Sequence, residues 1–267
     1  MAIRFIALDL DDTLLDDRGK IPAPAAEAIR EAREAGILVT IATGRMFCAT
    51  RSYARELALD LPLICYQGAL IQHHDAERPL ACLSLAPQPG RQLLQRLREL
   101  EVYYHGYFGD DLYVESITPE NKEYARHIGV ELRQADYLGD LMEDLPVMEI
   151  MAVPEPGRME AVEADLRERF GQHFHFTRFR DIVLEFMHPQ AGKDKALQSL
   201  SAQYGIKRHE VMAIGDGHND ITMLQWAGLG VAMDNAEAEV KAAADRVCPS
   251  NREAGVASAI RWAMNNA

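Results

Sequence analysis

The chain has 267 residues, 48% of them apolar, and its 28 Lys and Arg residues are outnumbered by 41 Asp and Glu residues. The formal net charge of −13 opposes attraction to a nucleic-acid backbone or an anionic membrane surface, so neither is an expected partner. The four cysteines form no CxxC pair, and no run of about 18 apolar residues occurs, which argues against a cysteine zinc site and a membrane span. With no signal-peptide pattern at the N-terminus, we expect a soluble cytoplasmic protein; the sequence carries no signal for an oligomeric state.

The first third of the chain alternates short β-branched runs with amphipathic helices, the pattern of a parallel sheet with crossover helices. The predicted strands are residues 3–8, 37–42 and 63–66, and the predicted helices are residues 25–35 and 48–57. Prolines precede the first helix and Gly36 follows it, which is the usual asymmetry of helix ends.

Two Pro- and Gly-containing stretches, residues 84–90 and 188–192, are typical of linkers. Between them we predict helices at 91–100 and 159–170 and strands at 102–107, 112–114, 147–153, 174–178 and 182–186. From Lys193 the α/β pattern resumes, with helices at 193–204, 221–227, 236–244 and 256–264 and strands at 211–214 and 229–231. The expected fold is a doubly wound, Rossmann-like parallel-sheet core, residues 1–84 and 188–267, interrupted by an α+β domain at 85–187.

Three carboxylates follow the first predicted strand, in the run Leu8-Asp9-Leu10-Asp11-Asp12-Thr13. In a doubly wound sheet, ligands bind beyond the carboxyl ends of the strands, so this concentration of negative charge indicates a bound cation. Mg²⁺ prefers oxygen ligands and keeps some of its waters, so a few carboxylates shared with a substrate phosphate would satisfy it. Taken alone, the motif also fits an acidic turn or a helix cap.

Two further predicted strands end in residues suited to binding an anion or a metal. Thr43-Gly44-Arg45 offers a hydroxyl and backbone N–H groups near a helix start. The strand at 211–214 runs into Gly215-Asp216-Gly217-His218-Asn219-Asp220, and Lys193 opens a helix behind Gly192. Each feature alone fits a turn or a solvated charge, but together they direct three sheet ends and one ammonium group toward one crevice.

The order of these motifs resembles that of the haloacid dehalogenase superfamily: Asp9-x-Asp11-x-Thr13, Thr43-Gly44-Arg45, Lys193 and Gly215-Asp216-x-x-Asn219-Asp220. The size and position of the insert are similar to the α/β cap of the Cof-type subfamily, and the resemblance extends over nearly the whole chain. Two departures occur. Asp12 stands where Cof-type members usually have Gly, and Gln67-Gly68-Ala69 stands where they often have Asn-Gly-Ala, which leaves Gln67 without an assigned role.

The resemblance implies a Mg²⁺-dependent phosphatase that hydrolyses small phosphorylated metabolites, sugar phosphates or similar monoesters, through a phosphoaspartate at Asp9. Asp11 would act as acid and then base, with its backbone carbonyl on the metal, and Asp9 and Asp216 would be the carboxylate ligands. The implied phosphate-binding residues are Leu10, Thr43, Gly44, Lys193 and Asn219. Asp220 would orient Lys193 or a metal-bound water.

Two alternatives stay open. A phosphotransferase or phosphomutase of the same superfamily would use the same residues with a sugar hydroxyl as acceptor, and a non-enzymatic, phosphoaccepting receiver-like module would share the acidic pair, Thr and Lys. Substrate specificity is expected in the insert. The basic segment His173, His175, Arg178 and Arg180 could meet a second phosphate, but its alternation favours an ordinary exposed strand face.

Overall fold

The computed structural model describes residues 2–179 and 182–266 and contains two compact units. The core unit holds the chain up to Ala81 and from Gly192 onward, and the cap unit is Cys82–Ala191. The border between Ala191 and Gly192 lies within the predicted linker 188–192, whereas the border between Ala81 and Cys82 precedes the predicted linker 84–90. Within the cap unit, the sulfur of Cys82 contacts that of Met148 at 3.7 Å.

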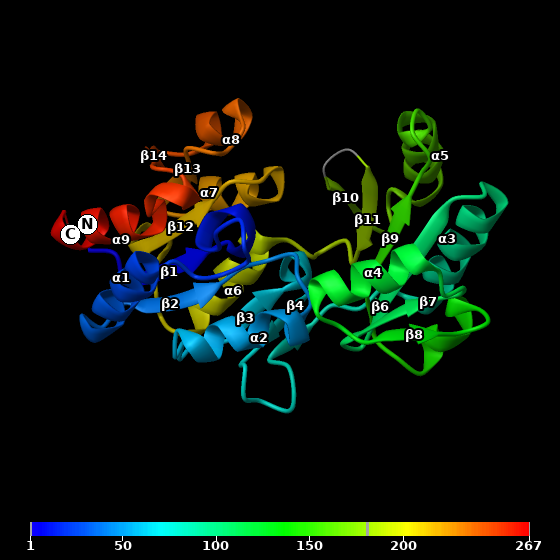
Figure 1. Cartoon of the computed structure of the whole chain (residues 1–267), viewed down its shortest axis with the longest axis horizontal. Coiled ribbons are helices and arrows are strands. Elements are labelled where there is room, and N and C mark those ends of the chain that lie inside the picture. The colour runs from blue at the N-terminus through cyan, green and yellow to red at the C-terminus, as the bar shows by residue number, and fades with distance from the viewer. Residues whose placement is uncertain (1, 180–181, 267) are drawn as a thin grey trace. The chain divides into compact units, whose positions relative to one another are not determined.

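A parallel sheet with the strand order β14-β13-β12-β1-β2 forms the centre of the core unit (Figure 1). Its strands are β1 (Phe5–Leu8), β2 (Leu38–Ile41), β12 (Val211–Gly215), β13 (Leu229–Met233) and β14 (Arg246–Cys248). The residues of β1 and β12 are all buried, as expected for parallel strands covered on both faces. β1 has β2 on one side and β12 on the other, so the topological switch point lies at the carboxyl end of β1.

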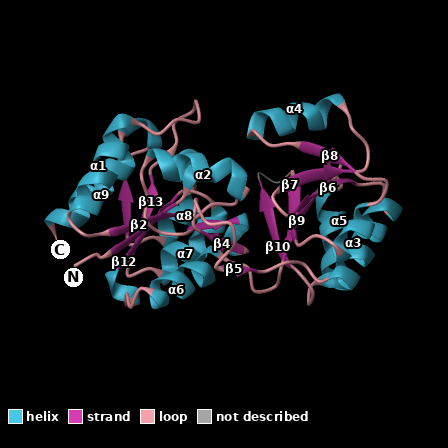
Figure 2. Cartoon of the chain, turned by 90° about the horizontal axis from the view of Figure 1, so that it is seen from below, coloured by secondary structure: helices cyan, strands magenta, loops and turns pink. Residues whose placement is uncertain are grey.

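Helices cover both faces of this sheet, and Figure 2 shows α1 and α9 on one face with α6 and α7 on the other. The face under α6 and α7 is closed by apolar side chains that include Ala7, Leu197 and Met223. The helices of the core unit are α1 (Ala23–Glu34), α2 (Phe47–Glu56), α6 (Lys193–Gln203), α7 (Ile221–Trp226), α8 (Ala238–Ala243) and α9 (Gly255–Asn265). The predicted doubly wound α/β core is therefore confirmed.

A small second sheet contains β3 (Leu63–Cys65), β4 (Leu70–Gln72) and β5 (Ala81–Cys82). An isolated parallel bridge between Ala42 and Ile64 links β3 to the segment that follows β2. This bridge brings the turn after β3, which contains Gln67 and Gly68, beside the residues that follow β2.

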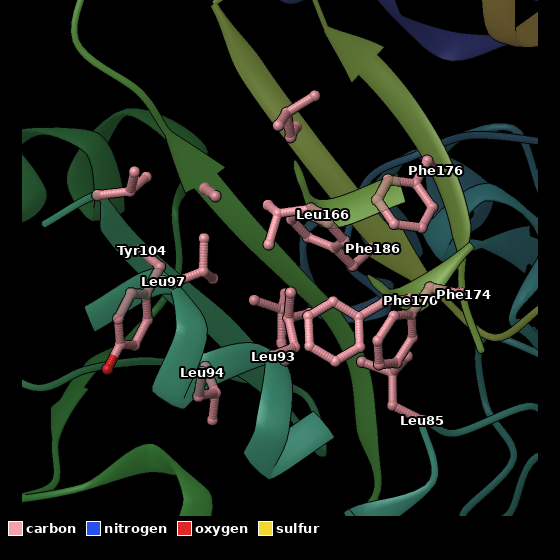
Figure 3. Close-up of a cluster of buried hydrophobic side chains, with 14 of the residues drawn as sticks. Leu85, Leu93, Leu94, Leu97, Tyr104, Leu166, Phe170, Phe174, Phe176 and Phe186 are labelled. Atoms are coloured by element: carbon pink, nitrogen blue, oxygen red, sulfur yellow. The ribbon is translucent and has the colours of Figure 1, made fainter. Parts of the chain in front are cut away.

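The cap unit contains a sheet with the strand order β10-β11-β9-β6-β7-β8, antiparallel except between β7 and β8. The strands are β6 (Tyr103–Phe108), β7 (Asp111–Val114), β8 (Leu132–Gln134), β9 (Val147–Val153), β10 (His175–Phe179) and β11 (Val183–Met187), and the helices are α3 (Pro87–Glu99), α4 (Pro119–Ile128) and α5 (Met159–Phe170). Leu93 of α3, Leu166 of α5 and Phe186 of β11 meet in one apolar cluster on one face of the sheet (Figure 3). The α+β insert is confirmed.

The linker predicted at residues 84–90 is wrong for its second half, because α3 begins at Pro87. Proline is tolerated at the first helical position, where its missing N–H has no helical partner in any case. Gly90 lies within this helix and faces the Met142 side chain, whose flexible methyl end would lie within 2.2 Å of a Cβ at this position.

Helix α4 was not predicted, although Thr118 and Asn121 form a reciprocal capping box at its start. In the basic segment, Arg178 donates to the Glu163 carboxylate at 2.6 Å, whereas Arg180 lies outside the described residues. Among the described residues, no helix is long and apolar enough to cross a bilayer.

Candidate active site

Asp9 directly follows β1 and stands at the switch point of the core sheet. Its backbone N–H donates to the Ile214 carbonyl at 2.9 Å, which extends the pairing of β1 with β12 by one residue. The chain then leaves the sheet in a tight turn, Leu10–Leu14, in which Asp12 has a left-handed φ of +56°. Since Leu10 and Leu14 are buried beneath this turn, the carboxylate of Asp9 is held at the end of the strand.

Lys193 is the first residue of α6 and only 1% of it is exposed. Its Nζ donates to Oδ1 of Asp9 and to Oδ1 of Asp220, both at 2.6 Å. A buried ammonium is stable only when carboxylates compensate for its lost hydration. The structure thus brings together three side chains that stand far apart in the sequence.

Two glycines fix the point at which Lys193 enters the site. Gly68 has a φ of +93°, and a Cβ on it would lie 2.3 Å from the carbonyl oxygen of Gly192. Only glycine permits both this conformation and this approach of two backbones. The turn after β3 therefore sets the start of α6, and with it the position of the lysine.

Asp220 is fully buried and both of its carboxylate oxygens are engaged. Oδ1 accepts from Lys193, while Oδ2 accepts from the backbone N–H groups of Asp216 and Gly217 at 3.1 and 2.9 Å. Asp220 consequently fixes both the ammonium group and the loop after β12.

Asp216 follows β12 and lies opposite the turn after β1. Its Oδ1 accepts a 2.6 Å hydrogen bond from the hydroxyl of Thr13. Ligand atoms of Asp9, Asp216 and Asp220 lie within 4.8 Å of one another, so the three carboxylates could hold a metal ion. Oδ2 of Asp9 and Oδ2 of Asp216 accept no hydrogen bond from any described residue, which leaves one oxygen of each carboxylate for a ligand.

The charges of this site favour a bound cation. Burial raises the pKa of Asp9 well above 3.8, and Asp220 adds to this effect while Lys193 offsets only part of it. Burial likewise raises the pKa of Asp216 to about 7, against the hydrogen bond from Thr13. Burial by itself lowers the pKa of Lys193, but Asp220 and Asp9 outweigh it and the pKa is raised. One ammonium for three carboxylates leaves an excess of negative charge, and an oxygen-only donor set with this excess fits Mg²⁺.

The carboxylate of Asp11 points to a different partner. Arg45 binds it with two hydrogen bonds, Nε to Oδ2 at 2.7 Å and Nη2 to Oδ1 at 2.6 Å. The Asp11 side chain is 52% exposed and does not take part in the cluster of Asp9, Asp216 and Asp220. The sequence motif contained Arg45 but gave no reason to pair it with Asp11.

Thr43 is buried at the end of β2, and its Oγ1 accepts the backbone N–H of Arg45 at 3.1 Å, so the hydroxyl hydrogen can be donated elsewhere. A Cβ on Gly44 would come within 2.5 Å of the Gln67 amide nitrogen, so Gly44 lies directly against that side chain. The Gln67 amide oxygen accepts from Asn219 at 3.0 Å.

Sequence reasoning missed Thr13, Arg45 and Gln67 as positioning residues. For Gln67 the available signal was its place directly after a predicted strand, like Asp9 and Asp216. Leu10 is also close to the site by its position in the chain, but its buried side chain packs inward and its carbonyl accepts from Leu15 at 2.9 Å. Its part in phosphate binding stays a prediction.

A doubly wound core with a lysine-containing carboxylate site at its switch point, carrying an inserted α+β domain, is an arrangement suited to phosphoryl chemistry. The family profile of haloacid dehalogenase-like hydrolases matches residues 6–260. The chain therefore belongs to the haloacid dehalogenase-like hydrolases, and it is an enzyme rather than a non-enzymatic receiver-like module.

Characterised relatives within this family indicate the kind of reaction that its members catalyse. The pyridoxal phosphate phosphatase YbhA of Escherichia coli (strain K12) is 31% identical over 97% of this chain and 98% of its own length. The 5-amino-6-(5-phospho-D-ribitylamino)uracil phosphatase YwtE of Bacillus subtilis (strain 168) is 29% identical, with 96% of each chain covered. The crystal structure of TM0651 from Thermotoga maritima has a TM-score of 0.86 and 30% identity over 97% of both chains. The protein is a phosphatase of the Cof-type subfamily.

Proposed function

We propose that this protein is a Mg²⁺-dependent phosphatase that hydrolyses small phosphorylated metabolites through a phosphoaspartate formed at Asp9. The observation that carries the proposal is the placement of the Lys193 ammonium 2.6 Å from both Asp9 and Asp220, with Asp216 in the same carboxylate cluster. This arrangement sets a carboxylate nucleophile beside a fixed positive charge, which phosphoryl transfer requires.

In the first half of the reaction, an oxygen of Asp9 attacks phosphorus and the bond from phosphorus to the leaving oxygen breaks. Asp11 donates its proton to that oxygen. In the second half, water attacks phosphorus, Asp11 takes a proton from it, and the bond between Asp9 and phosphorus breaks to release phosphate. Arg45 occupies both oxygens of the Asp11 carboxylate in this structure, so the acid–base role requires that this ion pair open when the substrate binds.

Preformed donors hold the transferring phosphoryl group. Lys193, the Thr43 hydroxyl and the N–H groups of Leu10 and Gly44 would bind its oxygens, and Asn219, fixed by Gln67, would contact the phosphoryl group or the substrate. Because Asp220 and the Gly68 turn fix Lys193, the ammonium needs no reorganisation when charge redistributes.

Asp9 and Asp216 each keep an oxygen for Mg²⁺, and the Asp11 backbone carbonyl would complete the set of protein ligands. Bound there, Mg²⁺ would neutralise charge on the phosphate and keep Asp9 ionised. Thr13 orients the Asp216 carboxylate toward this position, and Asp220 leaves both of its oxygens with Lys193 and the backbone.

Small phosphate monoesters are the substrate class that the relatives support. One is named for pyridoxal phosphate and another for a phosphoribityl compound, so sugar phosphates and similar monoesters form the first set to test. Among residues 2–179 and 182–266, no contact favours a phosphotransferase or phosphomutase over hydrolysis.

The experiment is a phosphate-release screen across metabolite phosphates with and without Mg²⁺, run beside an assay for isomer formation. We expect phosphate release that requires Mg²⁺, abolished in Asp9→Asn while circular dichroism shows an unchanged fold. Metal-dependent turnover retained by purified Asp9→Asn protein would refute the nucleophile assignment, and isomer formation without phosphate release would replace hydrolysis by phosphoryl transfer to an organic acceptor.

A further inference from the structure

The two faces of the cap sheet differ in chemistry. Along β6, Tyr104 and Phe108 belong to the apolar cluster on one face, while His105 and Tyr107 alternate to the other. Across β9 and β11, Glu149 pairs with Tyr107, and Glu185 lies in register with Met151, the partner of His105. The polar residues of three neighbouring strands therefore share one face of the sheet.

Helix α4 contributes to the same group. The hydroxyl of its Tyr124 lies 2.8 Å from that of Tyr107, and the Tyr124 ring centroid is 5.3 Å from that of His105. We call His105, Tyr107, Tyr124, Glu149 and Glu185 the cap polar cluster.

His105 is the first side chain in this cluster that the protein leaves unsatisfied. The residue is 5% exposed, and neither ring nitrogen has a hydrogen-bond partner among the described residues. The rings of Tyr103 and Tyr107, each with its centroid 5.8 Å away, flank it. Burial lowers the pKa of His105 to about 4, so at neutral pH it offers one donor and one acceptor nitrogen.

Glu149 is the second such side chain. It is 2% exposed, and its Oε1 has no partner among the described residues. Burial, with the neighbouring Glu185 charge, raises its pKa well above 4.5. Glu185 itself accepts from the Thr177 hydroxyl. Two carboxylates in adjacent strands therefore share one buried face.

Glu163, in helix α5 of the cap unit, is a buried glutamate whose carboxylate has hydrogen-bond partners within the protein, and it can be compared with Glu149. Glu163 is 8% exposed, yet Arg167 and Arg178 each donate to it at 2.6 Å. Buried polar groups without partners reduce stability, and apolar residues would fill the same face at no such cost. A structural role therefore explains Glu163 but does not explain His105 and Glu149.

The unsatisfied atoms define the chemistry of a missing partner. Carboxylates accept hydrogen bonds and attract positive charge, whereas a neutral imidazole both donates and accepts, as a hydroxyl does. We propose that the cap polar cluster binds a small organic ligand that presents a protonated amine to Glu149 and Glu185 and an adjacent hydroxyl group to His105. This inference needs no step of the phosphatase reaction, so its test is a measurement of binding.

Three probes that differ only at their first carbon test the ligand class. D-glucamine, D-glucitol and D-gluconate carry an ammonium, a hydroxyl and a carboxylate there, on the same polyol chain. Titration calorimetry on the full-length protein should give the tightest binding for D-glucamine and the weakest for D-gluconate. Binding of none of the three, or equal binding of D-glucamine and D-gluconate, would overturn the proposal.

Glutamine variants of two buried glutamates test whether Glu149 contributes to binding. Because burial raises the pKa of Glu149, the ammonium of the ligand must favour the ionised carboxylate for a charge-assisted hydrogen bond to form. Glu149→Gln keeps the shape of the side chain but cannot ionise, so it should weaken D-glucamine binding by about tenfold. D-glucitol binding should change less. The matched control is Glu163→Gln, which removes a buried but satisfied glutamate of the same unit and should leave D-glucamine binding unchanged. An equal loss in both variants would assign the effect to the stability of the cap unit and overturn the proposal.

His105→Phe separates binding from structure. Replacing an unsatisfied imidazole by an apolar ring among tyrosines should preserve or raise the melting temperature, because no protein hydrogen bond is lost. The same variant should weaken both D-glucamine and D-glucitol. A lower melting temperature with unchanged binding would show that His105 serves the fold and not a ligand.

Discussion

The carboxylate site at the parallel core sheet and the cap polar cluster on the mixed cap sheet both contain buried ionisable side chains. They differ in how many of these side chains have hydrogen-bond partners within the protein. In the core, Lys193 is bound to Asp9 and Asp220, and Thr13 holds Asp216. In the cap, His105 and Oε1 of Glu149 have no partner among the described residues. The core site is thus preorganised by its own hydrogen bonds, whereas the cap cluster leaves the choice of partner to a ligand.

The largest expected effect tests whether the core network depends on its ammonium. Lys193→Met leaves Asp9 and Asp220 buried without their cation, so we expect a loss of about 3–5 kcal/mol in the free energy of unfolding, together with loss of turnover. Urea denaturation measures the first and phosphate release the second. The control Lys195→Met removes an exposed lysine from the same helix; if both variants lose equal stability, the network does not hold the core together.

The next prediction concerns metal dependence. Asp216→Asn removes one proposed Mg²⁺ ligand, so Mg²⁺-dependent phosphate release should fall on the order of 100-fold or more. Thermal denaturation with and without Mg²⁺ should show stabilisation by the metal in the unmodified protein and little in the variant. Asp234→Asn is the matched control, because Asp234 also directly follows a core strand but is exposed. Equal Mg²⁺ responses in all three proteins would exclude Asp216 as a ligand.

A smaller effect is expected at Thr13. Its hydroxyl fixes the Asp216 carboxylate without contacting the reacting atoms, so Thr13→Val should raise the Mg²⁺ concentration for half-maximal activity on the order of tenfold. The maximal rate at saturating Mg²⁺ should fall less, and this difference distinguishes orientation of a ligand from general damage to the site. A parallel titration of Thr222→Val, an exposed threonine, provides the reference.

The smallest effect is a pH dependence in the cap unit. The folded protein holds a proton on Glu149 to a pH well above 4.5, whereas the unfolded chain releases it near 4.5. The unfolded state binds fewer protons in this range, so stability falls as pH rises through it. As pH rises above 4.5, the melting temperature should therefore decrease more in the unmodified protein than in Glu149→Gln, which has no carboxyl group to titrate at this position; identical slopes would contradict a raised pKa of Glu149. Both proteins contain His105, so its titration affects both melting temperatures alike.

The sequence predicted the core better than the cap for a physical reason. Residues such as Asp9 and Asp216 stand directly after buried strands, so the parallel topology alone brings them to one edge of the sheet. The pairing of Lys193 with Asp9 and Asp220 follows from charge and position in the same way. The fold class could therefore be predicted almost completely from hydrophobic pattern and turn residues.

The contacts that orient these groups could not be predicted from pattern. Thr13 and Gln67 act through hydrogen bonds to residues distant in the sequence, and such bonds depend on loop conformations such as the left-handed φ of Gln67. In the cap, His105 is a polar residue of a strand, and no role was predicted for it from the sequence, although the structure buries it. Tyr124 of α4 covers part of the sheet face that contains His105, and α4 was missed because its apolar pattern is short, although Thr118 and Pro119 are typical of a helix start.

A ribosome completes β1 long before it makes β12, the strand that later pairs with it. Until then β1 has one unpaired edge, and Asp9 has neither Lys193 nor Asp220 beside it. The cap unit, Cys82–Ala191, is one continuous segment with its own apolar cluster. We therefore expect it to fold first during translation, before the core sheet is complete. A partly synthesised chain therefore carries Asp9, the proposed nucleophile, without its cation, and should not bind phosphate esters before synthesis is finished.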